Sequence, residues 1–214
     1  MRNQNQPVAV EGYPFIALFA FITLVFALLQ WSFFTVLFLG LTLFTVYFFR
    51  NPERCIPTEE DAVVAPADGK VIFVGNVLED RYFQADAVKV SIFMSVFNVH
   101  VNRAPASGKV VDMFYNKGEF FNAALDKASL QNEQAGILLE TEGGSKLLFV
   151  QIAGLIARRI VTYPVVGDLL KRGMRYGLIR FGSRVDVYFP AGTEVLVRVG
   201  ERTVAGESVL AYLK

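Results

Sequence analysis

Residues 13–49 form an almost continuous apolar run that no charged residue interrupts. A single helix over this run would be about 55 Å long, whereas the hydrocarbon core of a bilayer is about 30 Å thick. A polar or interfacial break lies at residues 30–32, in the order Gln, Trp, Ser. The pattern therefore predicts two short helices, over residues 13–29 and 32–49, that form a transmembrane or membrane-inserted hairpin.

Arginines flank the apolar run on both sides, with Arg2 before it and Arg50 and Arg54 after it. A hairpin brings both flanks to one side of the membrane, and the positive-inside tendency makes that side cytoplasmic. A cleaved signal peptide is the alternative, but the run is too long and lacks a small-residue cleavage site. We therefore expect a cell-membrane protein whose remaining residues face the cytoplasm.

The pattern changes after Pro57 to short apolar runs separated by Gly, Pro and Asp. Such runs at near-regular spacing favour a mostly β fold, a β-sandwich or barrel-like α+β domain, over a βαβ array. Residues 122–133 are the best candidate for a helix or loop. The expected strands are residues 71–74, 87–93, 108–115, 136–141, 146–153, 186–189, 194–199 and 208–212. The expected organisation is a hairpin at 1–49, a junction at 50–62 and a β-rich domain at 63–214.

The charge balance and the rare residue types limit which binding partners and metal sites are expected. The 214 residues carry 21 Lys and Arg against 20 Asp and Glu, so the chain has no large net positive charge that would favour binding to nucleic acid. Cys55 and His100 are the single cysteine and the single histidine. This excludes an internal disulfide framework and a cysteine- or histidine-rich metal site, and no metal is expected. Any imidazole chemistry must pass through His100.

The first candidate for chemistry is Gly182-Ser183, in the sequence RFGSRVD. Such a pair most often forms a turn. Glycine also lets the backbone adopt strained conformations, which would bring its carbonyl close to the following hydroxyl. Ser183 could then attack that carbonyl and move the acyl group from nitrogen to oxygen. The resulting ester can undergo β-elimination and leave a ketone at a new N-terminus.

Two further motifs supply the partners that such a nucleophile needs. His100 lies in FNVHVNRAP and Asp68 in APADGK. Taken alone, a histidine between apolar residues is more often structural, and Asp-Gly is more often a tight turn. Together with Ser183 they provide a nucleophile, a base and a carboxylate that orients the base.

The three ordered motifs APADGKV, FNVHVNRAP and FGSRVD, behind an apolar hairpin, resemble the short-form phosphatidylserine decarboxylases of bacteria and archaea. The resemblance extends from Pro52 to the C-terminus. The longer branch of the family typically has Leu-Gly-Ser-Thr at its cleavage point. Phe181 and Arg184 replace the outer two residues here and leave Gly182-Ser183 intact.

The resemblance implies self-cleavage between Gly182 and Ser183, with His100 assisting and Asp68 orienting the imidazole. The products would be a large chain of residues 1–182 and a small chain of residues 183–214, held together as a heterodimer. Ser183 would become a covalent pyruvoyl cofactor. Its ketone would form a Schiff base with the amine of phosphatidylserine and yield phosphatidylethanolamine and CO₂, with His100 as proton donor.

A diacyl lipid cannot readily leave the bilayer, so the membrane hairpin suits this substrate. Aromatic and cationic side chains near the motifs are candidates for contacts with the glycerol, acyl chain or phosphate, although each is individually as well explained as core or solvated surface. The candidates are Phe97, Arg103, Arg158 and Arg180, with Phe120, Phe121 and Arg159 behind them.

Three alternatives stay open. An archaetidylserine-type lipid, with ether-linked chains, has the same headgroup and requires the same motifs. A soluble pyruvoyl amino-acid decarboxylase would leave the apolar run unexplained. A non-catalytic, membrane-anchored lipoyl-like module would share the β-hairpins, but it would leave His100 without a role, and it lacks a lysine in the expected turn. Self-cleavage after Gly182 separates the last alternative from an enzyme.

Overall fold

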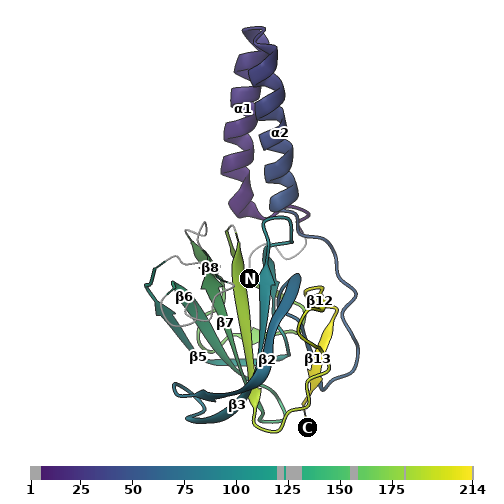
Figure 1. Cartoon of the computed structure of the whole chain (residues 1–214), viewed down its shortest axis with the longest axis vertical. Helices are drawn as coiled ribbons and strands as arrows, with labels where there is room; N and C mark the ends of the chain where they lie inside the picture. Colours follow the sequence, from purple (N-terminus) through teal and green to yellow (C-terminus); the bar gives the residue numbers. More distant parts are fainter. Residues whose placement is uncertain (1–5, 120–122, 124–131, 155–158, 181, 214) are drawn as a thin grey trace. The chain divides into compact units, whose positions relative to one another are not determined.

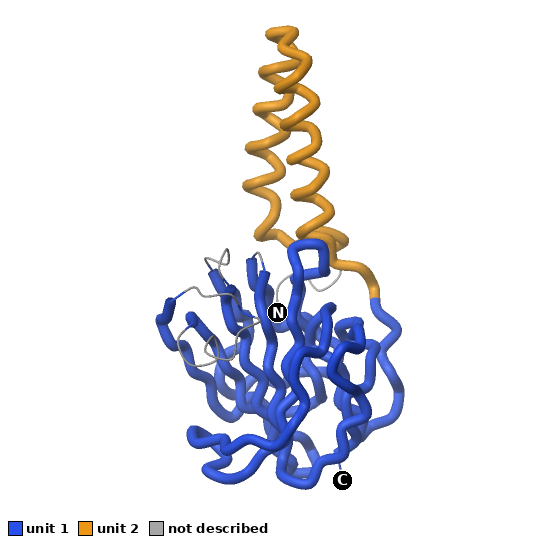
Figure 2. Tube along the Cα trace, viewed as in Figure 1, with its two compact units in different colours: residues 1, 54–214 blue, residues 2–53 orange. Residues whose placement is uncertain are grey.

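The computed structural model describes residues 6–119, 123, 132–154, 159–180 and 182–213. The chain divides into two compact units, residues 2–53 and residues 54–214 (Figure 2). The first unit is helical and the second is built from strands (Figure 1).

The helical unit is a hairpin of two apolar helices, preceded by a short 3₁₀ turn, η1 (Val10–Gly12). Helix α1 (Tyr13–Leu28) and helix α2 (Ser32–Phe48) end within one residue of the predicted bounds. The chain reverses at the predicted break, where Gln30 has a φ of 60°. Between the helices, the hydroxyl oxygens of Thr23 and Thr42 are 3.4 Å apart.

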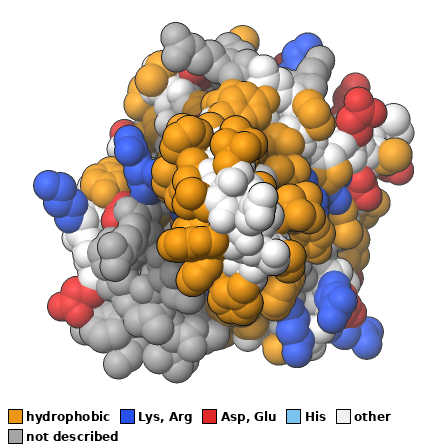
Figure 3. Space-filling view, turned by 90° about the horizontal axis from the view of Figure 1, so that it is seen from above, with side chains coloured by type: hydrophobic (Ala, Val, Ile, Leu, Met, Phe, Trp, Pro, Cys, Tyr) orange, Lys and Arg blue, Asp and Glu red, His pale blue; other side chains and the backbone are white. Residues whose placement is uncertain are grey.

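The hairpin exposes apolar side chains along its whole length, including Phe21, Leu28 and Phe33. In Figure 3, hydrophobic side chains gather around the centre of the view. The segment Val10–Leu28 has 19 residues and a mean hydropathy of 1.9, so by length and composition it can span a membrane. Helix α2 is also apolar, but with 17 residues it is too short to be counted as a candidate membrane span.

The second unit is built around an eight-stranded antiparallel sheet, which confirms the mostly β fold class. Strand β11 lies near its middle, hydrogen-bonded to β3 on one side and β7 on the other (Figure 1). The strand order across the sheet is β12 (Arg202–Thr203), β2 (Gly69–Glu79), β3 (Ala85–Met94), β11 (Ser183–Pro190), β7 (Lys146–Ala153), β6 (Gln134–Glu140), β5 (Gly108–Asn116) and β9 (Leu169–Leu170).

Two small sheets accompany the large one. Strands β4 (Val101–Arg103), β10 (Arg175–Ile179) and β8 (Ile160–Thr162) form the first, and β1 (Ala62–Val64) with β13 (Val209–Tyr212) forms the second. The strand predicted at residues 194–199 is wrong, because Val195 makes only an isolated bridge to Ala211. Most of the predicted helix or loop at 122–133 lies outside the described residues.

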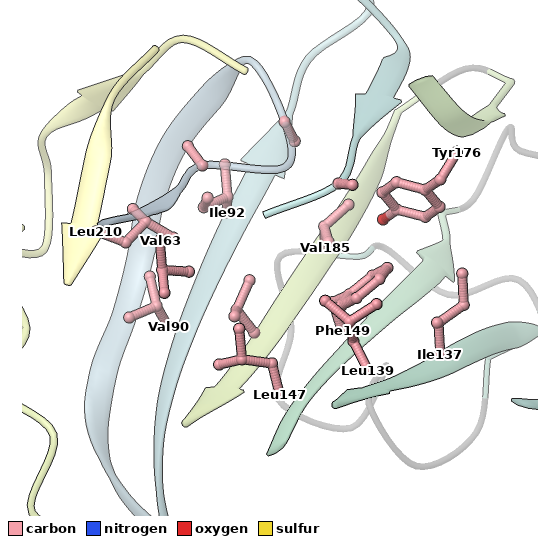
Figure 4. Packing of buried hydrophobic residues seen from close by; sticks show 14 of the residues in the cluster. Val63, Val90, Ile92, Ile137, Leu139, Leu147, Phe149, Tyr176, Val185 and Leu210 are labelled. Carbon is pink, nitrogen blue, oxygen red and sulfur yellow. The ribbon is translucent and has the colours of Figure 1, made fainter. Parts of the chain in front are cut away.

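The larger hydrophobic core lies on one face of the large sheet, and a smaller cluster that includes Leu148 and Ile152 lies on the other. Ile92, Phe149, Tyr176 and Val185 are almost fully buried and pack in the larger core (Figure 4). Side chains alternate between the two faces of a strand, so the residue two places before Val185 also faces this core. The alternation thereby places the hydroxyl of Ser183, the first residue of β11, in an apolar environment.

Candidate active site

Ser183 lies where three strands of the large sheet end or begin. It is the first residue of β11 and pairs with Met94, the last residue of β3, and with Ala153, the last residue of β7. Its side chain is fully buried, and its Oγ has no hydrogen-bond partner among the described residues. A buried hydroxyl normally finds a partner, and exceptions often mark sites of chemistry.

Gly182 adopts a conformation that favours glycine. Its φ is +62°, in the left-handed region, although a Cβ at this position would meet nothing within 4 Å. Glycine is therefore required here by the backbone conformation and not by crowding. The Gly182 amide points at the ring of His100, with its nitrogen 3.4 Å from Nε2.

His100 is held in one orientation by the loop between β3 and β4. Its Nδ1 lies 2.9 Å from the carbonyl oxygen of Asn98, and its side chain is buried. A carbonyl oxygen only accepts, so the neutral ring carries its hydrogen on Nδ1 and a lone pair on Nε2. The Asn98 side chain in turn accepts hydrogen bonds from the amide and hydroxyl of Ser95, at 2.9 and 2.8 Å, which fixes the turn.

Asp68 was predicted to orient His100, but its hydrogen bonds are to other residues. Its carboxylate accepts from Arg54 Nη2 at 2.9 and 3.0 Å and from the Ala205 amide at 2.8 Å. Within the described part of the chain these are its hydrogen bonds, and the Nδ1 position of His100 faces Asn98 instead. The structure thus brings Gly182, Ser183 and His100 together, and it places Asp68 in an ion pair with the junction residue Arg54.

The predicted lipid contacts lie in different environments. Phe97 is 66% exposed at the tip of the loop that carries His100. Arg103 is buried and donates to the Gly173 carbonyl at 2.9 Å. Burial, and then the nearby Arg54, lower the pKa of Arg103 from its usual range. The Arg180 amide donates to the carbonyl of Arg159 at 3.3 Å. Arg158, Phe120 and Phe121 lie outside the described residues.

Comparisons with known proteins match this chain over nearly its full length. The family model of phosphatidylserine decarboxylase matches residues 41–211. Proteins named phosphatidylserine decarboxylase proenzyme are 71% identical in Syntrophotalea carbinolica, 60% in Citrifermentans bemidjiense and 57% in Geotalea uraniireducens, each with 100% of both chains covered. The chain belongs to the phosphatidylserine decarboxylase family.

Membership in the phosphatidylserine decarboxylase family confirms the resemblance carried by the three motifs. It speaks against the alternative of a non-catalytic lipoyl-like module. Among the residues that the structure describes, no three His, Cys, Asp or Glu side chains are gathered as a metal-binding group.

The sequence analysis did not predict a buried polar network that joins two of the sheets. Gln151 on β7 donates from Nε2 to Asn102 Oδ1 on β4 at 2.8 Å, and its Oε1 accepts from the Thr162 hydroxyl on β8 at 3.0 Å. Asn102 and Gln151 are fully buried. These bonds join the small sheet that begins beside His100 to the large sheet that carries Ser183. The nearest sequence signal is the polar pair Asn102-Arg103 in an otherwise apolar segment.

Replacing Gln151 by Leu is expected to lower the free energy of unfolding by about 1–3 kcal/mol, because it leaves the buried Asn102 oxygen without its donor. The double variant Asn102→Leu/Gln151→Leu should lose less than the sum of the two single variants. Chemical denaturation measures the free energy of unfolding of all three variants, each made in a chain that cannot cleave itself. Strict additivity would show that the two side chains are not coupled.

The sequence analysis also did not predict an ion pair directly after the candidate cleavage point. Arg184 and Asp186 are buried on the opposite face of β11 from Ser183 and form a bidentate ion pair, with both N–O distances at 2.7 Å. Residues i and i+2 lie on one face of a strand, so opposite charges at this spacing were the available signal. The pair fixes the start of β11 from the side opposite the larger core.

Proposed function

We propose that this chain is a self-processing phosphatidylserine decarboxylase whose pyruvoyl group is made from Ser183. One observation carries the proposal: the buried hydroxyl of Ser183 has no described partner, and it follows a left-handed Gly182 whose amide nitrogen lies 3.4 Å from the Nε2 of His100. These described residues fit a group formed in place, because nucleophile, carbonyl and base converge at the start of one strand.

The chain's own residues account for the acyl shift that begins maturation. Ser183 Oγ attacks the Gly182 carbonyl carbon while His100 takes the hydroxyl proton and passes it to the amide nitrogen of residue 183. The C–N bond breaks and leaves an ester. Loss of the Ser183 α-proton then breaks the Cβ–Oγ bond, which frees the Gly182 carboxylate and leaves a dehydroalanine. Water converts the dehydroalanine into a terminal ketone and ammonia.

The two products are a chain of residues 1–182 and a chain of residues 183–214. The small chain begins with β11, which pairs over eight residues with β3 and over six with β7. Its core side chains Val185, Val187 and Phe189 are fully buried. Separation of the chains would break these pairings and expose this apolar surface, so we propose a stable heterodimer.

Decarboxylation needs an electron sink, which a pyruvoyl ketone supplies once it has bound the lipid amine. His100 is the proposed proton donor to the carbon that loses CO₂, since an imidazole has an ordinary pKa near neutrality. The Nδ1 contact with Asn98 keeps the ring oriented for this role.

We further propose that the substrate is taken from a membrane with the strand-built unit on its cytoplasmic side. The support is the apolar segment Val10–Leu28 and the arginines at positions 2, 50 and 54. Phe97 lies three residues before His100 and its side chain is exposed, so it is the proposed contact with the lipid interface. Arg103, Arg158 and Arg180 remain proposed phosphate contacts.

The test is to incubate the protein with phosphatidylserine vesicles and borohydride. We expect CO₂ and phosphatidylethanolamine without borohydride, and with it a covalent lipid adduct on the chain 183–214 alone. An ether-linked serine lipid assayed in parallel separates the two lipid classes. An adduct on residues 1–182, or turnover that borohydride leaves untouched, would contradict the proposal.

A further inference from the structure

Gly154 lies directly against the carbonyl that is proposed to be cut. It follows Ala153, the last residue of β7, which pairs with Ser183, so it lies opposite Gly182 just beyond the end of that strand. A Cβ built on Gly154 would be 2.0 Å from the Gly182 carbonyl oxygen and 2.9 Å from its carbon. The hydrogen in that position points toward the oxygen, in the arrangement of a weak C–H···O contact.

The two glycines are needed for different reasons. Gly182 has a φ of +62° and open space where a Cβ would lie. Gly154 is not among the residues with positive φ, but its Cβ position is occupied by the carbonyl oxygen. An alanine at position 154 would therefore suit its own backbone and would displace the scissile carbonyl.

The surroundings decide which of the two groups moves. The Ala153 carbonyl accepts from the buried Asn132 Nδ2 at 2.7 Å, and the Ala153 amide donates to the Glu133 carbonyl at 2.9 Å. These bonds fix the peptide group that leads into Gly154. Gly182 has open space at its Cβ position, so Gly182 is the one of the two residues that can yield.

We propose that Gly154 is a positioning residue for self-cleavage: its missing side chain keeps the Gly182 carbonyl where Ser183 Oγ can reach it. The inference rests on the proposed function. In the step concerned, an Oγ–C bond forms, the C–N bond breaks, and the hydroxyl proton moves to nitrogen. Real Cβ atoms do not approach within 3.0 Å, so an alanine would move the carbonyl by about 1 Å. A misplacement of that size costs on the order of 100-fold in rate.

The experiment compares full-length wild type, Gly154→Ala and Gly143→Ala by intact mass at intervals after synthesis. Gly143 is the matched control, because its Cβ would meet nothing closer than the Thr141 hydroxyl at 4.0 Å. We expect Gly143→Ala to cut at the wild-type rate and Gly154→Ala to cut about 100-fold more slowly. Hydroxylamine, which cleaves esters and leaves amides, should not release the small chain from uncut Gly154→Ala.

Three outcomes would overturn the inference. They are cutting of Gly154→Ala at the wild-type rate, release of its small chain by hydroxylamine, and unfolding of Gly154→Ala/Ser183→Ala at a temperature well below that of Ser183→Ala. The last would make Gly154 a purely structural glycine. A wild-type chain that never cuts would instead refute the proposed function itself.

Discussion

Ser183→Ala is expected to remain one uncut chain of 214 residues and to have no decarboxylase activity. Alanine has no hydroxyl to attack the Gly182 carbonyl, and it cannot become the ketone that would accept electrons from the substrate. The loss should therefore be complete within detection. Intact mass spectrometry of the purified protein, together with assay of CO₂ release from phosphatidylserine vesicles, measures both effects.

Ser91→Ala is the matched control for this experiment. Ser91 lies on the adjacent strand β3, is 1% exposed, and also has no described hydrogen-bond partner for its Oγ. It pairs with Asp186, three residues beyond Ser183. Its variant should cut and turn over normally. Two chains from Ser183→Ala would contradict the assignment of Ser183 as nucleophile.

His100→Ala is expected to slow self-cleavage by about 10²–10⁴-fold, the usual contribution of a positioned general base. The Nε2 lone pair that faces the Gly182 amide is lost, and no second imidazole exists in the chain to replace it. The fraction of uncut chain, followed by mass over time, measures the effect.

Phe97→Ala serves as the control for His100→Ala, because Phe97 lies in the same loop with its side chain exposed. Its variant should mature normally. If His100→Ala matured as fast as this control, another group would have to act as the base.

The fold class could be predicted, and Ser183 could be proposed as the nucleophile, because both inferences use local patterns in the sequence. The break at residues 30–32 predicted the hairpin, and short apolar runs separated by Gly, Pro and Asp predicted most strands of the large sheet. Strands β4, β8, β9 and β12 have only two or three residues each, too few for a period to show. The error at 194–199 has a different cause: the segment is a short apolar run, but in the structure it makes only one isolated bridge, from Val195 to Ala211.

The partners of the site residues could not be predicted, because they depend on other segments of the chain or on the exact conformation of a loop. Nothing in APADGK indicates that Asp68 would pair with Arg54, or in FNVH that Asn98 would take the Nδ1 of His100. The role of Gly154 depends on the register between β7 and β11, which sequence periodicity leaves undetermined.

The meeting of β3, β7 and β11 at Ser183 has a consequence for quality control. On the proposed chemistry, an unfolded or misregistered chain holds neither the left-handed Gly182 nor the oriented His100, so it stays whole. The reactive ketone would then arise only in molecules whose central sheet has already formed. Chain length on a gel would thereby report correct folding of each molecule, and defective copies would remain chemically inert.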